Sequence, residues 1–298
     1  MKPNGKNLIL ELLMANQNQA ISAKEAIAAA ALFGMTPNTI RVALARLSAE
    51  GLLMGAGRGS YQLGHQAVGL AQDLAKWRQI EQRLRPWHGD YIAVYSAGLG
   101  RTDRTALRRR ERALEMLGFA ELGKGLHIRP NNIETDVAAV RQRLMSLGLE
   151  PSAYVCRMDQ LDPEHDEQLH HLWDGRALNQ HYDTIQRQLN EWLSHADQLD
   201  LEVAAREAFL LGRAAIRQMV FDPLLPEPLI DQQCRHEFFE CVRQYDRVGR
   251  RIWQQVRLVD RITPIAEDDL NPPSVMLAPA PSVLRRELDD LENPPHVY

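Results

Sequence analysis

Residues 36–63, TPNTIRVALARLSAEGLLMGAGRGSYQL, decide the fold of the N-terminal part of this chain. Pro37 at the first helical position predicts a helix that starts at Thr36. Its apolar residues follow the i, i+3, i+4, i+7 spacing of one helical face: Ile40, Ala43, Leu44 and Leu47. Gly51 ends the helix, and two short strands follow, joined by a glycine-rich tip that carries Arg58. A helix followed by a basic-tipped hairpin is typical of a winged helix-turn-helix and indicates DNA binding.

The preceding residues complete that arrangement, so we expect residues 1–65 to form the DNA-binding domain. Residues 6–16 predict a short helix, and a second helix starts at Ile21, where Ser22 and Glu25 have the spacing of a capping box. Residues 1–64 carry six basic and three acidic side chains, whereas the whole chain has a formal net charge of −4. The local surplus of positive charge suits a nucleic-acid partner.

A helical projection of the Thr36 helix identifies the side chains that face DNA. Asn38, Val42 and Ala45 lie opposite the apolar stripe, flanked by Arg41 and Arg46. Arginine and asparagine suit guanine and adenine edges, and short side chains let the backbone approach. With the phosphate-binding candidates included, the predicted DNA-contacting residues are Thr36, Asn38, Thr39, Arg41, Val42, Ala45, Arg46, Arg58 and Ser60. The alternative is that the arginines are solvated charges and that Tyr61 packs against the wing.

The order of predicted elements indicates a second, smaller α/β module. After a helical linker at 66–87, strands and helices alternate as β-α-β-β-α-β, which describes a ferredoxin-like module at 88–162 that connects the domains and helps the chain to dimerise. Residues 163–258 predict a helical domain with helices at about 164–198, 201–221 and 230–257. Residues 259–298 hold seven of the sixteen prolines, which favours an extended tail. The fold class expected is α+β, with three domains.

The composition indicates the class of protein and its cellular location. Charged residues make up 25% and hydrophobic residues 45% of the 298, as in ordinary globular proteins. The three cysteines, Cys156, Cys234 and Cys241, make a disulfide framework unexpected, and no Cys/His spacing for zinc occurs. Without a signal-peptide pattern or a long apolar run, we expect a cytoplasmic location.

Several short segments resemble the PaaX family, which represses bacterial phenylacetate-degradation operons. They are Trp87-His88-Gly89-Asp90-Tyr91, Leu117-Gly118-Phe119, Gly125-Leu126-His127-Ile128-Arg129-Pro130, Leu172-Trp173-Asp174 and Phe221-Asp222-Pro223-Leu224-Leu225-Pro226, together with Arg108, Tyr182 and Arg217. The resemblance covers roughly residues 5–257 and departs from the family at 96–105. It implies a homodimer that binds a palindromic operator on double-stranded DNA. It also implies release by an acyl-CoA thioester such as phenylacetyl-CoA.

The candidate effector-binding residues are Arg108, Trp173, Tyr182, Arg213 and Arg217. The arginines at 101–112 form a solvated helix face, a phosphate contact beside the winged helix, or a site for the anionic part of a CoA thioester. For Arg217 the structural alternative is a pair with Asp222 that locks the Asp-Pro loop to its helix.

No catalytic constellation or cofactor motif occurs, so we expect neither an enzyme nor a cofactor. One alternative is a metal-dependent nuclease that uses Asp90 in the ferredoxin-like module, but a single carboxylate is a weak metal site. His165, His170 and His171 lack the spacing of a metal motif. The other alternative is a DNA-binding activator that takes no small ligand.

Overall fold

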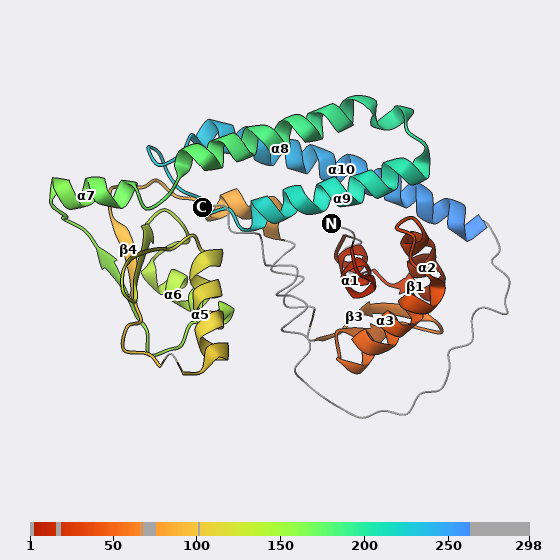
Figure 1. Cartoon of the computed structure of the whole chain (residues 1–298), viewed down its shortest axis with the longest axis horizontal. Helices are drawn as coiled ribbons and strands as arrows, with labels where there is room; N and C mark the ends of the chain where they lie inside the picture. The colour runs from red at the N-terminus through yellow and green to blue at the C-terminus, as the bar shows by residue number, and fades with distance from the viewer. Residues whose placement is uncertain (1–2, 16–18, 66, 68–75, 101, 263–298) are drawn as a thin grey trace. The chain divides into compact units, whose positions relative to one another are not determined.

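The structure is a computed structural model that describes residues 3–15, 19–65, 67, 76–100 and 102–262. It is a mixed helix-and-sheet (α+β) protein with a helical C-terminal region (Figure 1). Residue contacts divide the chain into two compact units. Unit 1 contains residues 1–76, 195–212 and 246–298, and unit 2 contains residues 77–194 and 213–245. Within the described residues, no helix is long and apolar enough to cross a membrane.

Unit 1 begins with three helices and a small sheet. The helices are α1 (Gly5–Ala15), α2 (Ala23–Ala31) and α3 (Pro37–Ala49), and the strands are β1 (Ile21–Ser22), β2 (Leu53–Gly55) and β3 (Ser60–Leu63). The sheet has the order β1-β3-β2, with antiparallel pairs throughout. Ser22 and Glu25 form the expected capping box, but Ile21 and Ser22 pair with β3 instead of starting the helix.

Unit 2 contains a four-stranded antiparallel sheet with two crossing helices. In chain order it consists of β4 (Tyr91–Tyr95), α5 (Arg104–Met116), β5 (Ala120–Gly123), β6 (Leu126–Pro130), α6 (Val137–Leu147) and β7 (Tyr154–Met158). The strand order is β5-β6-β4-β7. The first and third strands of the module therefore lie at its centre, and the second and fourth lie at its edges.

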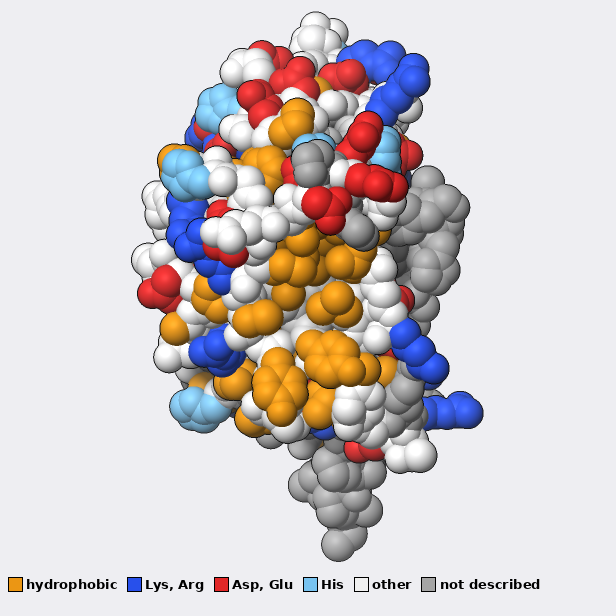
Figure 2. All heavy atoms as spheres, turned by 90° about the vertical axis from the view of Figure 1, so that its left-hand side faces the viewer, with side chains coloured by type: hydrophobic (Ala, Val, Ile, Leu, Met, Phe, Trp, Pro, Cys, Tyr) orange, Lys and Arg blue, Asp and Glu red, His pale blue; other side chains and the backbone are white. Residues whose placement is uncertain are grey.

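The two faces of this sheet are covered differently. Successive residues of a strand point to opposite faces, so Ile92 and Val94 share one face, where both are buried. The helix α6 packs on β7 and on α5. On the other face, the helix α7 (Pro163–His170) contributes Leu169 to a cluster with Tyr91 at one end of the sheet. Figure 2 shows hydrophobic side chains gathered and open to solvent on one face of the molecule.

Long helices follow, with two differences from expectation. The helix expected at about 164–198 is interrupted: α7 ends at His170, α8 (Gly175–His195) starts after a turn, and η2 (Ala196–Gln198) is a short 3₁₀ segment. Asp174 accepts a hydrogen bond from the Ala177 amide at 2.8 Å, which caps α8 and separates it from α7. The helices α9 (Leu201–Val220) and α10 (Gln232–Ile262) complete the chain. Thus α10 continues into the region where the sequence predicts an extended tail.

The predicted linker is only partly described. Its residues 76–83 form η1 (Lys76–Arg83), which is 3₁₀ rather than α-helical. Residues 66 and 68–75 of this linker, like residues 263–298 of the tail, lie outside the described part of the chain.

Candidate nucleic-acid interface

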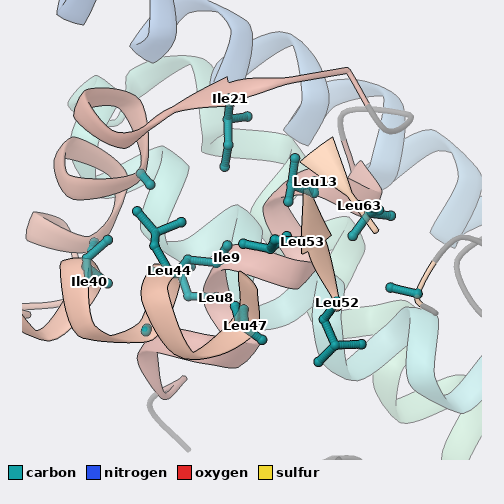
Figure 3. Close-up of a cluster of buried hydrophobic side chains, with 14 of the residues drawn as sticks. Leu8, Ile9, Leu13, Ile21, Ile40, Leu44, Leu47, Leu52, Leu53 and Leu63 are labelled. Carbon is teal, nitrogen blue, oxygen red and sulfur yellow. The ribbon is translucent and has the colours of Figure 1, made fainter. Parts of the chain in front are cut away.

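Helix α3 is held at its start and along one side. Thr36 is its N-cap and accepts a hydrogen bond from the Thr39 amide, with Pro37 at the first position, as the sequence predicts. Figure 3 shows Ile40, Leu44 and Leu47 directed into a core that they share with α1 and the small sheet. All three side chains are almost fully buried. Any ligand of α3 must therefore bind its opposite side.

The opposite side of α3 presents the predicted DNA-contacting residues. Asn38, Thr39, Ala45 and Arg46 are exposed, and Arg41 is partly exposed. Val42 stands out, because 42% of this large apolar residue is accessible in the centre of the helix. A short apolar side chain between polar ones suits contact with thymine methyl groups in a major groove.

Thr36 and Thr39 have a local role at the start of this helix. Their hydroxyl groups lie 2.9 Å apart, and the Thr36 hydroxyl also receives the Thr39 amide. Thr36 therefore caps the helix. Because its side chain is also exposed, it can contact a phosphate as well.

The hairpin β2–β3 forms a narrow, basic-tipped projection. Met54 pairs with Gln62 and Gly55 with Tyr61, and the Ala56 amide donates to the Ser60 carbonyl at 2.9 Å. Arg58 is exposed between Gly57 and Gly59, whose positive φ angles allow the tight tip. Ser60 is only partly exposed in the strand.

The base of this hairpin is held by α2 and the core. The Ala23 amide donates to the Gly59 carbonyl at 2.9 Å, which ties the tip to the start of α2. The Tyr61 ring packs against the hydrophobic core of unit 1, as the packing alternative predicts. Arg58 therefore lies on a loop that the Ala23–Gly59 hydrogen bond and the packing of Tyr61 hold in place.

The effector candidates Tyr182 and Trp173 are both engaged inside unit 2. The Tyr182 side chain is completely buried and donates its hydroxyl to Asp222 Oδ2 at 2.5 Å. Burial and the neighbouring Asp222 carboxylate raise the pKa of Tyr182. The Trp173 indole donates to the Gly118 carbonyl at 3.2 Å and packs against Leu225 and its neighbours. In this structure both side chains hold the Asp-Pro loop.

The three candidate arginines differ in their surroundings. Arg108 lies on the exposed side of α5, whereas Arg213 and Arg217 on α9 are partly buried. The Arg217 guanidinium lies 5.7 Å from the centre of the Phe221 ring. The expected Arg217–Asp222 pair is replaced, because Asp222 takes its hydrogen bonds from Tyr182 and from the Leu224 amide.

One arginine of the basic segment is structural. Arg110 is buried and binds Glu150 through two nitrogens, at 2.6 and 3.0 Å. This hydrogen-bonded pair lowers the pKa of the Glu150 carboxyl. Arg110 therefore links α5 to the turn after α6 and is not part of the solvated face.

The sequence did not identify three polar residues that complete the buried network. Arg129, Asn132 and Arg235 are at most 2% exposed. Arg129 donates to Asn132 Oδ1 at 2.8 Å and to the Leu117 carbonyl, and Asn132 donates to the Leu224 carbonyl at 2.7 Å. Arg235 donates to the Leu225 carbonyl at 2.5 Å. Desolvation lowers the pKa of Arg129 to about 9.

This network brings the family-like segments of the chain together. The strand end at Arg129, the Leu117-Gly118 turn and the Asp222–Leu225 loop meet at one buried site. The only sequence signal for it was the set of segments itself, because an isolated arginine within a strand does not reveal its partners.

Asp90 has a structural environment rather than that of a metal ligand. Asn131 Nδ2 donates to its carboxylate at 2.6 Å, and Arg157 Nε lies 3.0 Å from the same oxygen. The Trp87 indole donates to the Asp90 carbonyl at 2.6 Å, which closes the Trp-His-Gly-Asp turn. Among the described residues, no group of three His, Cys, Asp or Glu side chains is arranged to hold a metal.

Comparison with known proteins identifies the C-terminal region. Residues 173–255 match the family model described as the PaaX-like protein C-terminal domain. No curated protein matches the chain. Among solved structures, the uncharacterized protein Rv0674 from Mycobacterium tuberculosis is similar, with 21% identity and a TM-score of 0.59, over 87% of this chain and 99% of that one. That similarity concerns the fold alone.

These findings describe an α+β protein whose helical C-terminal region contains a PaaX-like domain, which suggests a regulator of the PaaX type. The match over residues 173–255 supports the expected PaaX family.

Proposed function

We propose that the protein is a ligand-responsive, DNA-binding repressor whose α3 reads duplex DNA. The observation that carries this proposal is the division of α3 into a buried apolar side and an exposed side with Asn38, Val42 and Ala45 between two arginines. Unit 1 contributes the helix order, the three-stranded sheet and the braced hairpin of a winged helix-turn-helix. The PaaX-like domain supports the regulator class.

The two arginine positions have different roles in this proposal. Arg41 on α3 contacts base edges in the major groove, where an arginine fork discriminates guanine. Arg58 at the hairpin tip contacts phosphate or the minor groove, which adds affinity with little sequence information. Thr36, Thr39, Arg46 and Ser60 add neutral or charged contacts to the DNA backbone.

The second part of the proposal concerns assembly. The β-α-β-β-α-β order with strand order β5-β6-β4-β7 supports a ferredoxin-like module in unit 2, which we propose contributes to a homodimer. A homodimer places two α3 helices on the half-sites of a palindrome. In this proposal the protein acts in the cytoplasm, has no catalytic activity and needs no cofactor.

The effector in this proposal is an acyl-CoA thioester, and the target is an aromatic catabolic operon of the phenylacetate type. A thioester that binds one dimer geometry better than another lowers operator affinity by that difference. Because Tyr182 and Trp173 serve the buried network, Arg108, Arg213 and Arg217 are the residues to test first by titration with acyl-CoA. If a panel of acyl-CoAs leaves DNA affinity unchanged, the alternative of a regulator without a small ligand is supported.

Arg41→Ala tests the role of α3. Duplexes enriched by the wild-type protein from a random library serve as the probe, and fluorescence anisotropy measures the Kd. Loss of one bidentate base contact, worth about 1–3 kcal/mol, is expected to raise the Kd for enriched duplex by about 5- to 150-fold. The Kd for scrambled duplex should change much less.

Arg206→Ala is the matched control, because it removes the same charge from an exposed position of unit 1 outside α3. Equal affinities for enriched duplex in wild type and Arg41→Ala would contradict the assignment of α3 as the recognition helix.

A further inference from the structure

The hydrophobic core around α3 is completed by residues from a distant part of the sequence. Its buried members lie between Leu8 and Ala67, but Phe209, Leu210 and Trp253 pack against it as partly buried side chains. Phe209 and Leu210 belong to α9 and Trp253 belongs to α10, and all three lie in unit 1. They also lie within residues 173–255, which match the PaaX-like model. Residues outside the predicted DNA-binding domain therefore contact its core.

This contact is made at the turn that leads into α3. Phe33 lies in the turn between α2 and α3, just before the Thr36 cap, and is only 7% exposed. Its ring centre lies 5.1 Å from that of Phe209, with the two rings inclined at 61°. The Phe209 ring lies 6.2 Å from the Trp253 ring, at 64°. Both are edge-to-face contacts, which aromatic pairs prefer, so the three rings connect the turn to α9 and α10.

The turn links the position of Phe33 to the start of α3. The Phe33 and Met35 amides both donate to the Ala30 carbonyl, at 3.0 and 3.2 Å. Because these hydrogen bonds restrict the backbone of the turn, a displacement of the Phe33 ring also displaces the first turn of α3. That first turn carries Asn38, one of the predicted DNA-contacting residues.

The helices α9 and α10 pack closely beside these rings. Ala208 precedes Phe209, and Gly249 lies one helical turn before Trp253. A Cβ on Gly249 would lie 3.6 Å from the Ala208 Cβ, which is an ordinary van der Waals distance. Such close packing leaves little room for the two rings to shift independently of their helices. The two helices therefore give Phe33 a firm support within unit 1.

From these contacts we propose that Phe209 and Trp253 are positioning residues for DNA reading, which act through Phe33 on the orientation of α3. The proposal rests on the proposed function, because it takes α3 as the helix that reads DNA. An arginine fork discriminates guanine only when its donors align with the base edge. Attraction to phosphates carries no such requirement. Loss of the support at Phe33 should therefore reduce specific affinity more than non-specific affinity.

Trp253→Ala in the full chain tests the positioning role. The Kd for enriched duplex should rise at least about 5-fold, the smallest loss expected for one base contact, and the Kd for scrambled duplex should change much less. Trp253→Phe keeps an aromatic ring and should restore most of the affinity. The matched control is Trp192→Ala, which removes an indole that lies 4.7 Å from the Tyr245 ring inside unit 2 and should leave both Kd values unchanged. Thermal melting checks that each variant is folded.

A double-mutant cycle separates positioning from a general weakening of the fold. If Trp253 acts through α3, the Arg41 base contact is already impaired in Trp253→Ala, so Arg41→Ala should cost much less there than in the wild type. Additive losses, or an unchanged Kd for enriched duplex in folded Trp253→Ala, would overturn the proposal. Phe209→Leu removes a ring but keeps an apolar side chain, and it replaces Trp253→Ala in the cycle if that variant does not fold.

Hydrogen exchange without DNA gives an independent readout of the same contact. The α3 amides of Trp253→Ala should exchange at least about 10-fold faster than those of the wild type, while the amides of β4 in unit 2 keep their rates. Unchanged exchange in α3 would overturn the proposal. A wild type that binds both duplexes equally, with faster α3 exchange in the variant, would contradict the proposed function alone. A wild type that binds enriched duplex specifically, with unchanged α3 exchange in the variant, would contradict this inference alone.

Discussion

At the residue scale, the Tyr182 hydroxyl is expected to stabilise the fold rather than to bind a ligand. Tyr182→Phe removes the donor to the fully buried Asp222, whose pKa burial already raises. A buried acceptor deprived of a partner costs about 1–3 kcal/mol, so the free energy of unfolding in urea should fall by that amount. Tyr154→Phe makes the same chemical change at an exposed side chain and should alter stability by less than about 0.5 kcal/mol. Equal effects of the two changes would contradict the structural role.

A second residue, Glu81, should make stability depend on pH. Burial alone would raise the pKa of its carboxyl, but hydrogen bonds from His236 and Arg243 outweigh burial and lower that pKa. The Arg243–Glu81 contact is 2.6 Å long, between side chains that are 16% and 24% exposed. A lowered folded-state pKa means that this stabilisation is present above the unfolded pKa and is lost as pH falls through the folded value.

Glu81→Gln should therefore lower the free energy of unfolding by about 1 kcal/mol at pH 7. The difference from wild type should shrink as pH falls below 4.5, the unperturbed pKa. Urea unfolding at a series of pH values measures it, with Glu202→Gln as the control at an exposed position of α9. A difference that grows at low pH would show that Glu81 is not the titrating group.

The features that depend on local spacing could be predicted from the sequence. The apolar stripe of α3, its Thr36 cap and the Ser22–Glu25 box all depend on residues within one or two helical turns. The buried network was missed because its bonds join distant segments: Asn132 and Leu224 are 92 residues apart. Nothing within a few residues of Arg129 signals such a partner.

At the scale of elements, the Gly118 turn should be intolerant of any side chain. Its φ is +69°, and a Cβ would lie 2.6 Å from the Pro223 Cα, which is backbone and cannot rotate away. Gly34, in the turn between α2 and α3, has φ +72° and nothing within 4 Å of a Cβ. An alanine at either site costs about 1–2 kcal/mol because its backbone is left-handed. Only at Gly118 does the added Cβ also clash with a neighbouring atom.

Gly118→Ala is therefore expected to lose at least about 2 kcal/mol more unfolding free energy than Gly34→Ala, as measured by urea denaturation. Similar losses would show that the contact between the α5–β5 turn and the Asp-Pro loop is not tight.

The boundary between α7 and α8 was not predicted from the sequence. Asp174 and Gly175 mark the start of α8, but the helical periodicity on both sides of them concealed the break.

At the scale of the whole molecule, the proposed repressor combines a DNA-reading unit with a unit that contains the four-stranded sheet, and the PaaX-like match over residues 173–255 contributes to both units. The α+β class and the helical C-terminal region could be predicted from the order of elements. The contact-based units could not, because residues of α9 and α10 contribute to both units. Long-range packing, which no local pattern records, decides how such helices are shared.

The measurement that tests the central claim most directly is the specificity ratio of the wild-type protein for DNA. The Kd for a duplex enriched from a random library is compared with the Kd for a scrambled duplex of equal length and composition, at one stated salt concentration. A sequence-specific regulator should bind the enriched duplex at least about 1,000-fold more tightly. Equal affinity for the two duplexes, or no enrichment at all, would contradict the account.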